Sequence, residues 1–136
     1  MELIQELEVW YVIPSIRREI TIAMNSSGLK QTEIAKRLGV TKAAVNQYLS
    51  GKRGNEIKLT KTLKENINQA AGSINNELDS IRYIQYLLNL SRKEKIVCNI
   101  HRTLKKELNG CNACFELPEI KQNLIQIRRQ IWEKFI

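Results

Sequence analysis

The three cysteines and the single histidine of this chain lie close together, in a pattern typical of metal sites. Cys98 and His101 are separated by two residues, and so are Cys111 and Cys114. On a helix, residues spaced in this way share one face, so Cys98 and His101 can reach one ion together. Gly110 ends such a helix, and the second pair can then turn back as a knuckle. The spacing predicts a site with four ligands.

Three alternatives remain open for these four residues. Three thiolates and one imidazole suit Zn²⁺, which prefers sulfur and nitrogen ligands in tetrahedral sites. The same donors can hold an iron–sulfur cluster. The third alternative is no metal at all, with the cysteines acting as small buried residues or pairing as a Cys111–Cys114 disulfide. A bound metal would fix the C-terminal part of the chain and, in a sharper hypothesis, would sense metal or redox conditions.

A second set of residues, from Gln31 to Ser50, has the spacing of two short helices joined by a sharp turn. Ile34, Ala35 and Leu38 repeat at helical spacing and predict the inner face of the first helix. Gly39 can adopt the positive φ that a sharp turn requires. Thr41 is a good N-cap for a second helix, which Gly51 would end. The residues expected to face inward from the second helix are Ala44, Val45, Tyr48 and Leu49.

This segment resembles the helix-turn-helix of the lambda-repressor-like (Cro/repressor, or Xre-type) regulators. The small residue Ala35, the turn glycine Gly39 and the apolar positions fall where that family places them. Residues 28–54 are also similar to archaeal predicted regulators of this group, and Pro14 with the basic pair after Ile16 fits the same subgroup. The resemblance covers residues 14 to about 75. It implies an all-α lambda-repressor-like domain that binds double-stranded DNA as a homodimer.

The resemblance also implies which residues meet DNA. The second helix would enter the major groove, where lysine can donate to guanine, Asn or Gln can pair with adenine, and alanine can touch a thymine methyl. Polar groups at the start of the first helix would hold a phosphate, and the basic residues after the second helix would neutralise the DNA backbone. The predicted DNA-binding residues are Gln31, Thr32, Thr41, Lys42, Ala43, Asn46, Gln47, Ser50, Lys52 and Arg53.

The same archaeal regulators often carry paired cysteines after the DNA-binding part. Here a histidine, His101, stands where a cysteine would be expected. This departure favours zinc and leaves the iron–sulfur cluster as the alternative.

The charge distribution agrees with an anionic partner. The formal net charge is +8, and the densest basic part of the chain is the segment with the paired helices. The first thirteen residues carry three glutamates and no base, which argues against a secretory signal, and no apolar run is long enough to span a membrane. We therefore expect a cytoplasmic protein.

The remaining sequence predicts further helices. With only six glycines and two prolines, long helices should dominate an all-α fold. We expect helices at about 15–25, 59–74, 81–88, 96–108 and 118–135, with Gly72 and Ser73 weakening the second. The last carries Ile120, Leu124, Ile127, Ile131 and Phe135 at spacings typical of either a coiled-coil seam or a core face. The predicted division is an N-terminal extension (1–13), the DNA-binding domain (14–75) and a C-terminal helical region (76–136) with the metal site and a dimerisation role.

The function that these patterns favour is sequence-specific regulation of transcription, responsive to metal or redox conditions. An antitoxin of a toxin–antitoxin pair with the same DNA-binding domain is an alternative, and an interaction module that binds protein is another. We expect no enzymatic activity, because there is no glycine-rich phosphate loop and the paired cysteines lack the βαβ setting of a redox enzyme.

Overall fold

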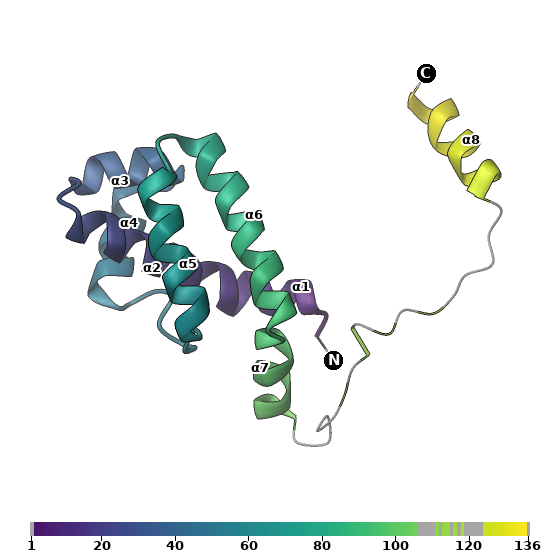
Figure 1. Ribbon diagram of the computed structural model, residues 1–136, viewed down its shortest axis with the longest axis horizontal. Helices are drawn as coiled ribbons and strands as arrows, with labels where there is room; N and C mark the ends of the chain where they lie inside the picture. The colour runs from purple at the N-terminus through teal and green to yellow at the C-terminus, as the bar shows by residue number, and fades with distance from the viewer. Residues whose placement is uncertain are drawn as a thin grey trace.

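The computed structural model describes residues 2–105, 111, 113–114, 116, 118 and 124–135, with side chains only from 129 onward in the last range. All regular structure within these ranges is helical, so the all-α prediction is confirmed (Figure 1). The elements are α1 (Ile4–Leu7), the π-helical turn η1 (Glu8–Val12), α2 (Ile13–Ser26), α3 (Gln31–Leu38), α4 (Lys42–Ser50), α5 (Lys61–Ser73), α6 (Glu77–Lys93), α7 (Ile96–Leu104) and α8 (Leu124–Phe135).

One hydrophobic core runs from the N-terminal segment to α7. Helix α2 is central to it, because it contacts α3, α4, α5 and α6. Figure 1 shows α5 and α6 side by side, with α2 crossing behind them. Residues on both sides of position 75 fill this core. Its fully buried apolar residues include Leu7, Val12, Ile16, Ile20, Ile34, Val45, Leu63, Ile67, Ile74 and Leu87.

Helix α2 continues an earlier helical run. The helix expected at 15–25 is present, but it begins earlier, at Ile13, and follows directly on η1. In η1 the backbone N–H of Ile13 donates to the carbonyl of Glu8, which is the wide π-type hydrogen bond. Pro14 comes next and has no N–H to donate to the preceding turn. A wider turn immediately before Pro14 is consistent with that missing donor.

The N-terminal segment is anchored by a partly buried ion pair. Arg92 of α6 donates from Nε to one carboxylate oxygen of Glu8 and from Nη2 to the other, each at 3.0 Å. Glu8 is 2% exposed, and Leu7 beside it is fully buried. Two parallel bonds from a guanidinium fix geometry as well as charge. They hold residues 4–12 against α6, and α1 also contacts α7.

The C-terminal helices partly match their expected bounds. Helix α5 ends at Ser73, where Gly72 and Ser73 were predicted to weaken it, and α7 ends at Leu104. Residues 106–108, through which this helix was expected to continue, lie outside the described residues. The same holds for Ile120 in the last predicted helix, which is described as α8 from Leu124. None of the helices in the described part of the chain has the length and hydropathy of a membrane-spanning segment.

Candidate nucleic-acid interface and cysteine cluster

Helices α3 and α4 are joined by the sharp turn that their sequence predicts. Gly39 adopts a left-handed conformation with φ +64°, and the N–H groups of Gly39 and Val40 donate back to carbonyls of α3. Thr41 is extended, and its hydroxyl oxygen accepts a hydrogen bond from the N–H of Ala44 at 3.0 Å. The direction of α4 is therefore determined by residues within a few positions of its first turn.

The inner faces of the two helices are as predicted. Ile34, Ala35 and Leu38 of α3 are buried, and so are Ala44, Val45 and Tyr48 of α4. Leu49 is half-buried and packs against the same core. With one side of α4 committed to the core, the position of every other α4 side chain follows from helical geometry.

The outer face of α4 is polar and free of negative charge. Lys42, Ala43, Asn46 and Ser50 are exposed, and Gln47 is half-buried at the edge of this face. The helix contains no aspartate or glutamate. The hydroxyl of Ser50 donates to the backbone carbonyl of Gln47, which leaves the hydroxyl oxygen free to accept. This face therefore offers donors and acceptors to an anionic surface without repelling it.

The start of α3 lies beside this face. Lys30, Gln31, Thr32 and Lys42 line an open hollow of about 540 Å³, together with Asn25 from the end of α2 and Leu29 from the connection that follows it. The free backbone N–H groups of a helix N-terminus favour an anion such as a phosphate. Asn25 was not among the predicted contact residues, because its approach to α3 depends on the turn at Gly28 and not on a helical spacing.

The basic residues after α4 are held close to it. Both Lys52 and Arg53 are exposed, and the Arg53 guanidinium lies 5.7 Å from the centre of the Tyr48 ring. Gly54, which follows, is buried against α2. The stacking on Tyr48 limits the directions in which Arg53 can extend.

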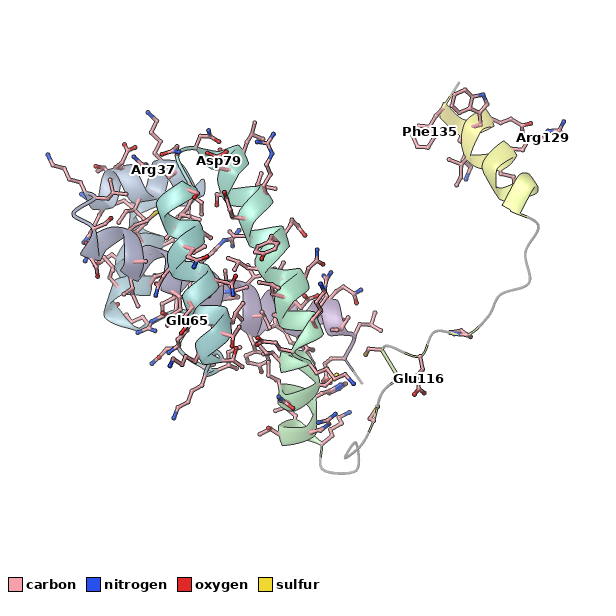
Figure 2. All side chains as sticks on the ribbon, in the orientation of Figure 1. Arg37, Glu65, Asp79, Glu116, Arg129 and Phe135 are labelled. Atoms are coloured by element: carbon pink, nitrogen blue, oxygen red, sulfur yellow. The ribbon has the colours of Figure 1, made fainter. Side chains whose placement is uncertain are left out.

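The arginine of α3, Arg37, is engaged in contacts within the protein. Arg37 pairs with Glu33 at 3.0 Å and donates to the carbonyl of Ile74 at 3.1 Å, so it joins α3 to the turn between α5 and α6 (Figure 2). The pair also neutralises the one acidic residue of α3.

The helix-turn-helix is also recovered by comparison with known families. A family model described as helix-turn-helix matches residues 20–55, from the middle of α2 to just beyond α4. No curated protein and no solved structure matches the chain. The fold is thus all-α and lambda-repressor-like, and the matched part is a helix-turn-helix of the type that binds double-stranded DNA.

The structure gathers the four predicted metal ligands around one small cavity. This cavity, of about 20 Å³, is lined by Cys98, His101, Arg102, Cys111, Ala113 and Cys114. Its volume is close to that of a single bound water or ion. Among the residues described, no group of three or more Cys, His, Asp or Glu side chains is arranged to hold a metal ion. The ligands therefore converge without adopting a coordination geometry.

The environment of the cluster affects its ionisation. Burial raises the pKa of the Cys98 thiol, and the neighbouring thiol of Cys114 raises it further, while Arg102 opposes both effects. A cation in the cavity would oppose this rise in the pKa of Cys98 and favour its thiolate. The donor set fits a soft metal ion in this chemical sense.

A carboxylate that the spacing analysis did not identify also reaches the cluster. Oε2 of Glu2 lies 3.4 Å from Nε2 of His101. Hydrogen bonding from its own backbone is the main cause that lowers the pKa of Glu2. No local signal could have found this contact, because Glu2 and His101 lie near opposite ends of the described domain.

Proposed function

We propose that this chain is a sequence-specific regulator of transcription that inserts α4 into the major groove of double-stranded DNA. The proposal rests on one observation: the outer face of α4 is exposed, polar and free of acidic residues, beside the hollow at the start of α3. A major groove is wide enough for one such helix. Since DNA is the partner, we expect the protein to act in the cytoplasm.

The exposed side chains divide by role. Lys42, Asn46 and Gln47 carry donors and acceptors suited to base edges, and Ala43 supplies a methyl contact. Gln31 and Thr32 supply contacts to a phosphate at the N-terminus of α3, and Ser50 supplies one at the end of α4. Lys52 and Arg53 act on the backbone charge alone. Thr41 contributes mainly by capping α4, with its exposed position allowing an additional backbone contact.

The test begins with selection of bound sequences from a random pool of duplexes, followed by titrations on the selected site. Gln47→Ala should weaken binding by about 1–3 kcal/mol and relax the preference at one base pair. Lys52→Ala should weaken binding to all duplexes alike and reduce the salt dependence. Gln85→Ala and Lys93→Ala remove the same side-chain types from exposed positions on α6 and serve as controls. Unchanged affinity in both test variants would contradict the assignment of α4 as the recognition helix.

We propose that the regulator binds as a homodimer on two half-sites about 34 Å apart, or a multiple of that spacing. Helix α8 supplies a candidate contact, because Ile131, Trp132 and Phe135 are exposed on it. Figure 2 shows Phe135 and Arg129 extending from different sides of this helix. Sedimentation of the full chain should give a dimer, and Ile131→Glu should shift it toward the monomer. A monomeric wild-type chain would rule out this mode of binding.

We also propose that Cys98, His101, Cys111 and Cys114 hold zinc, with an iron–sulfur cluster as the alternative. What supports this is the single cavity that all four residues line. Zinc would supply a fixed cross-link between α7 and the residues that follow it, and a cluster would add sensitivity to oxidation. Because Ile96 and Val97 of α7 lie in the same core as Val45 of α4, a change at the cluster can reach the DNA-binding face.

Elemental analysis and the visible absorption spectrum of anaerobically purified chain test this site. We expect one zinc per chain, or the absorption of a cluster, and a loss of stability when a chelator removes the metal. Removal should also change affinity for the selected duplex. If the metal-free protein is as stable as the purified chain and binds the selected duplex with the same affinity, the proposed metal site is contradicted.

A further inference from the structure

Nε2 of His101 faces the carboxylate of Glu2. The two atoms are 3.4 Å apart, and the His101 side chain is 13% exposed. Both Nε2 of His101 and Oε2 of Glu2 are buried, and neither makes a hydrogen bond. A buried polar atom without a hydrogen bond costs free energy, so the mutual approach of these two atoms requires an explanation.

The position of Glu2 is determined by the N-terminal segment. Leu7 is fully buried, and the Glu8 carboxylate is held in two bonds by Arg92. Helix α1 contacts α7, which carries His101. The segment is thus fixed on the body of the protein a short distance after Glu2, and it brings the Glu2 carboxylate to Nε2 of His101.

The chemistry of histidine ligands accounts for the pairing. A histidine that binds a metal uses one ring nitrogen and usually donates the N–H of the other to a carboxylate, a carbonyl or water. That second bond selects the tautomer and orients the ring. With Nε2 directed at Glu2, the nitrogen left for an ion is Nδ1, and the ring lines the cavity that the three cysteines share.

We propose that Glu2 is a positioning residue for the metal site: it holds His101 as the Nε2–H tautomer, so that Nδ1 is the ligating nitrogen. This inference rests on the metal site proposed above. It adds that the N-terminal segment is a part of that site and not an independent extension. Occupation of the site then stabilises the contact between the N-terminal segment and α7, and the loss of the ion weakens that contact.

The histidine itself supplies a direct readout. His101 is the only histidine of the chain, so long-range ¹H–¹⁵N spectra of the full-length protein report its two ring nitrogens without assignment ambiguity. Titrated with Zn²⁺, the wild-type chain should show a protonated Nε2 and a metal-bound Nδ1. A merely structural role of Glu2 would not determine which nitrogen is protonated.

Affinity supplies the second readout, measured by competition between the protein and a chromophoric chelator for Zn²⁺. Glu2→Gln removes the charge with little change in size and should weaken zinc binding 10- to 100-fold, the range found when such carboxylates are lost. Glu2→Asp should recover part of the loss. Glu65→Gln removes the same charge from an exposed position on α5 and should leave affinity unchanged (Figure 2). His101→Ala should weaken binding at least as much as Glu2→Gln.

The outcomes separate the two proposals. A wild-type chain that binds neither zinc nor a cluster would refute the metal site, and the role of Glu2 with it. Zinc bound through Nε2, or with equal affinity in wild type and Glu2→Gln, would leave the metal site standing and overturn the inference about Glu2. Normal far-ultraviolet circular dichroism of Glu2→Gln establishes that a lost affinity is not a lost fold.

Discussion

Helices α4 and α7 are both nine residues long, yet they are held and used in different ways. Helix α4 begins with the Thr41 cap and ends at Gly51, and its polar side chains face outward. Helix α7 begins after Lys95, which has φ +56° and provides no side-chain cap. Cys98 and His101 of α7 line a cavity instead, and Cys111 and Cys114 complete that cavity from farther along the chain.

The difference shows how each kind of site depends on the chain around it. A DNA-binding face such as the one proposed for α4 needs a rigid helix in the right direction, and the turn and cap residues beside it help to supply that. A ligand cavity such as the one beside α7 needs side chains from separate segments to meet. The α4 region should therefore be sensitive to local backbone changes, and the α7 region to distant contacts.

The largest expected effect concerns Gly54, which follows α4 and packs against α2. A Cβ at Gly54 would collide with the carbonyl oxygen of Pro14 and would lie 2.9 Å from Cβ of Arg18. Because the nearest obstacle is backbone, it cannot rotate away, and Gly54→Ala should lower the free energy of unfolding by about 3 kcal/mol. Chemical denaturation measures the loss.

Gly28→Ala is the matched control. Gly28 also has a positive φ, +97°, but a Cβ there would have nothing within 4 Å. Its cost should be limited to backbone strain of about 1 kcal/mol. Equal losses in the two variants would show that the approach of Gly54 to α2 does not matter for stability.

The next effect belongs to the α7 region and concerns the Glu8–Arg92 pair. Arg92→Leu leaves the Glu8 carboxylate buried without its partner, a change that costs about 3–5 kcal/mol for a fully buried pair. Because the Arg92 side chain is 38% exposed, we expect a loss of about 2 kcal/mol. Hydrogen exchange should become faster in residues 4–12 and in α7.

Two further variants sharpen this result. Glu8→Gln combined with Arg92→Leu removes the unpaired charge and should recover part of the lost stability. Arg82→Leu removes an exposed arginine whose distance to Asp79 is 3.8 Å, and it should change stability little. Faster exchange in α4 instead of α7 would contradict the division of the protein into these two regions.

The same division explains what the sequence could predict. Gly39, Thr41 and the apolar positions around them lie within a few residues of the turn that they form, so the paired helices and their exposed faces could be predicted. Cys98, His101, Cys111 and Cys114 come from two segments, but the matching spacing within each pair already predicted that the pairs share one site. Glu2 beside His101 and Glu8 beside Arg92 could not, because each pair joins segments that only the tertiary fold brings together. The π-type turn before Pro14 also depends on hydrogen bonds that no hydrophobic spacing reveals.

A smaller effect tests how far local capping controls DNA binding. Thr41→Ala removes the acceptor for the N–H of Ala44 and should cost about 1 kcal/mol of stability. Asn76 caps α6 in the same way, accepting from Asp79 at 2.9 Å, so Asn76→Ala should cost a similar amount. Only Thr41→Ala should also weaken binding to the selected duplex, because α4 is the proposed recognition helix. Equal DNA affinity in the two variants would show that the Thr41 cap does not contribute to DNA recognition.

The smallest effect on stability is expected at Arg53. Its guanidinium stacks on Tyr48 from an exposed position, and such contacts contribute about 0.5–1 kcal/mol. Arg53→Met keeps an apolar chain over the ring and removes the charge, so thermal unfolding should change by only a few degrees. Affinity for all duplexes should nevertheless fall and should depend less on salt concentration, because one positive charge that neutralises a DNA phosphate is lost. If stability fell while salt dependence did not, Arg53 would belong to the packing of the α4 region and not to its DNA-binding surface.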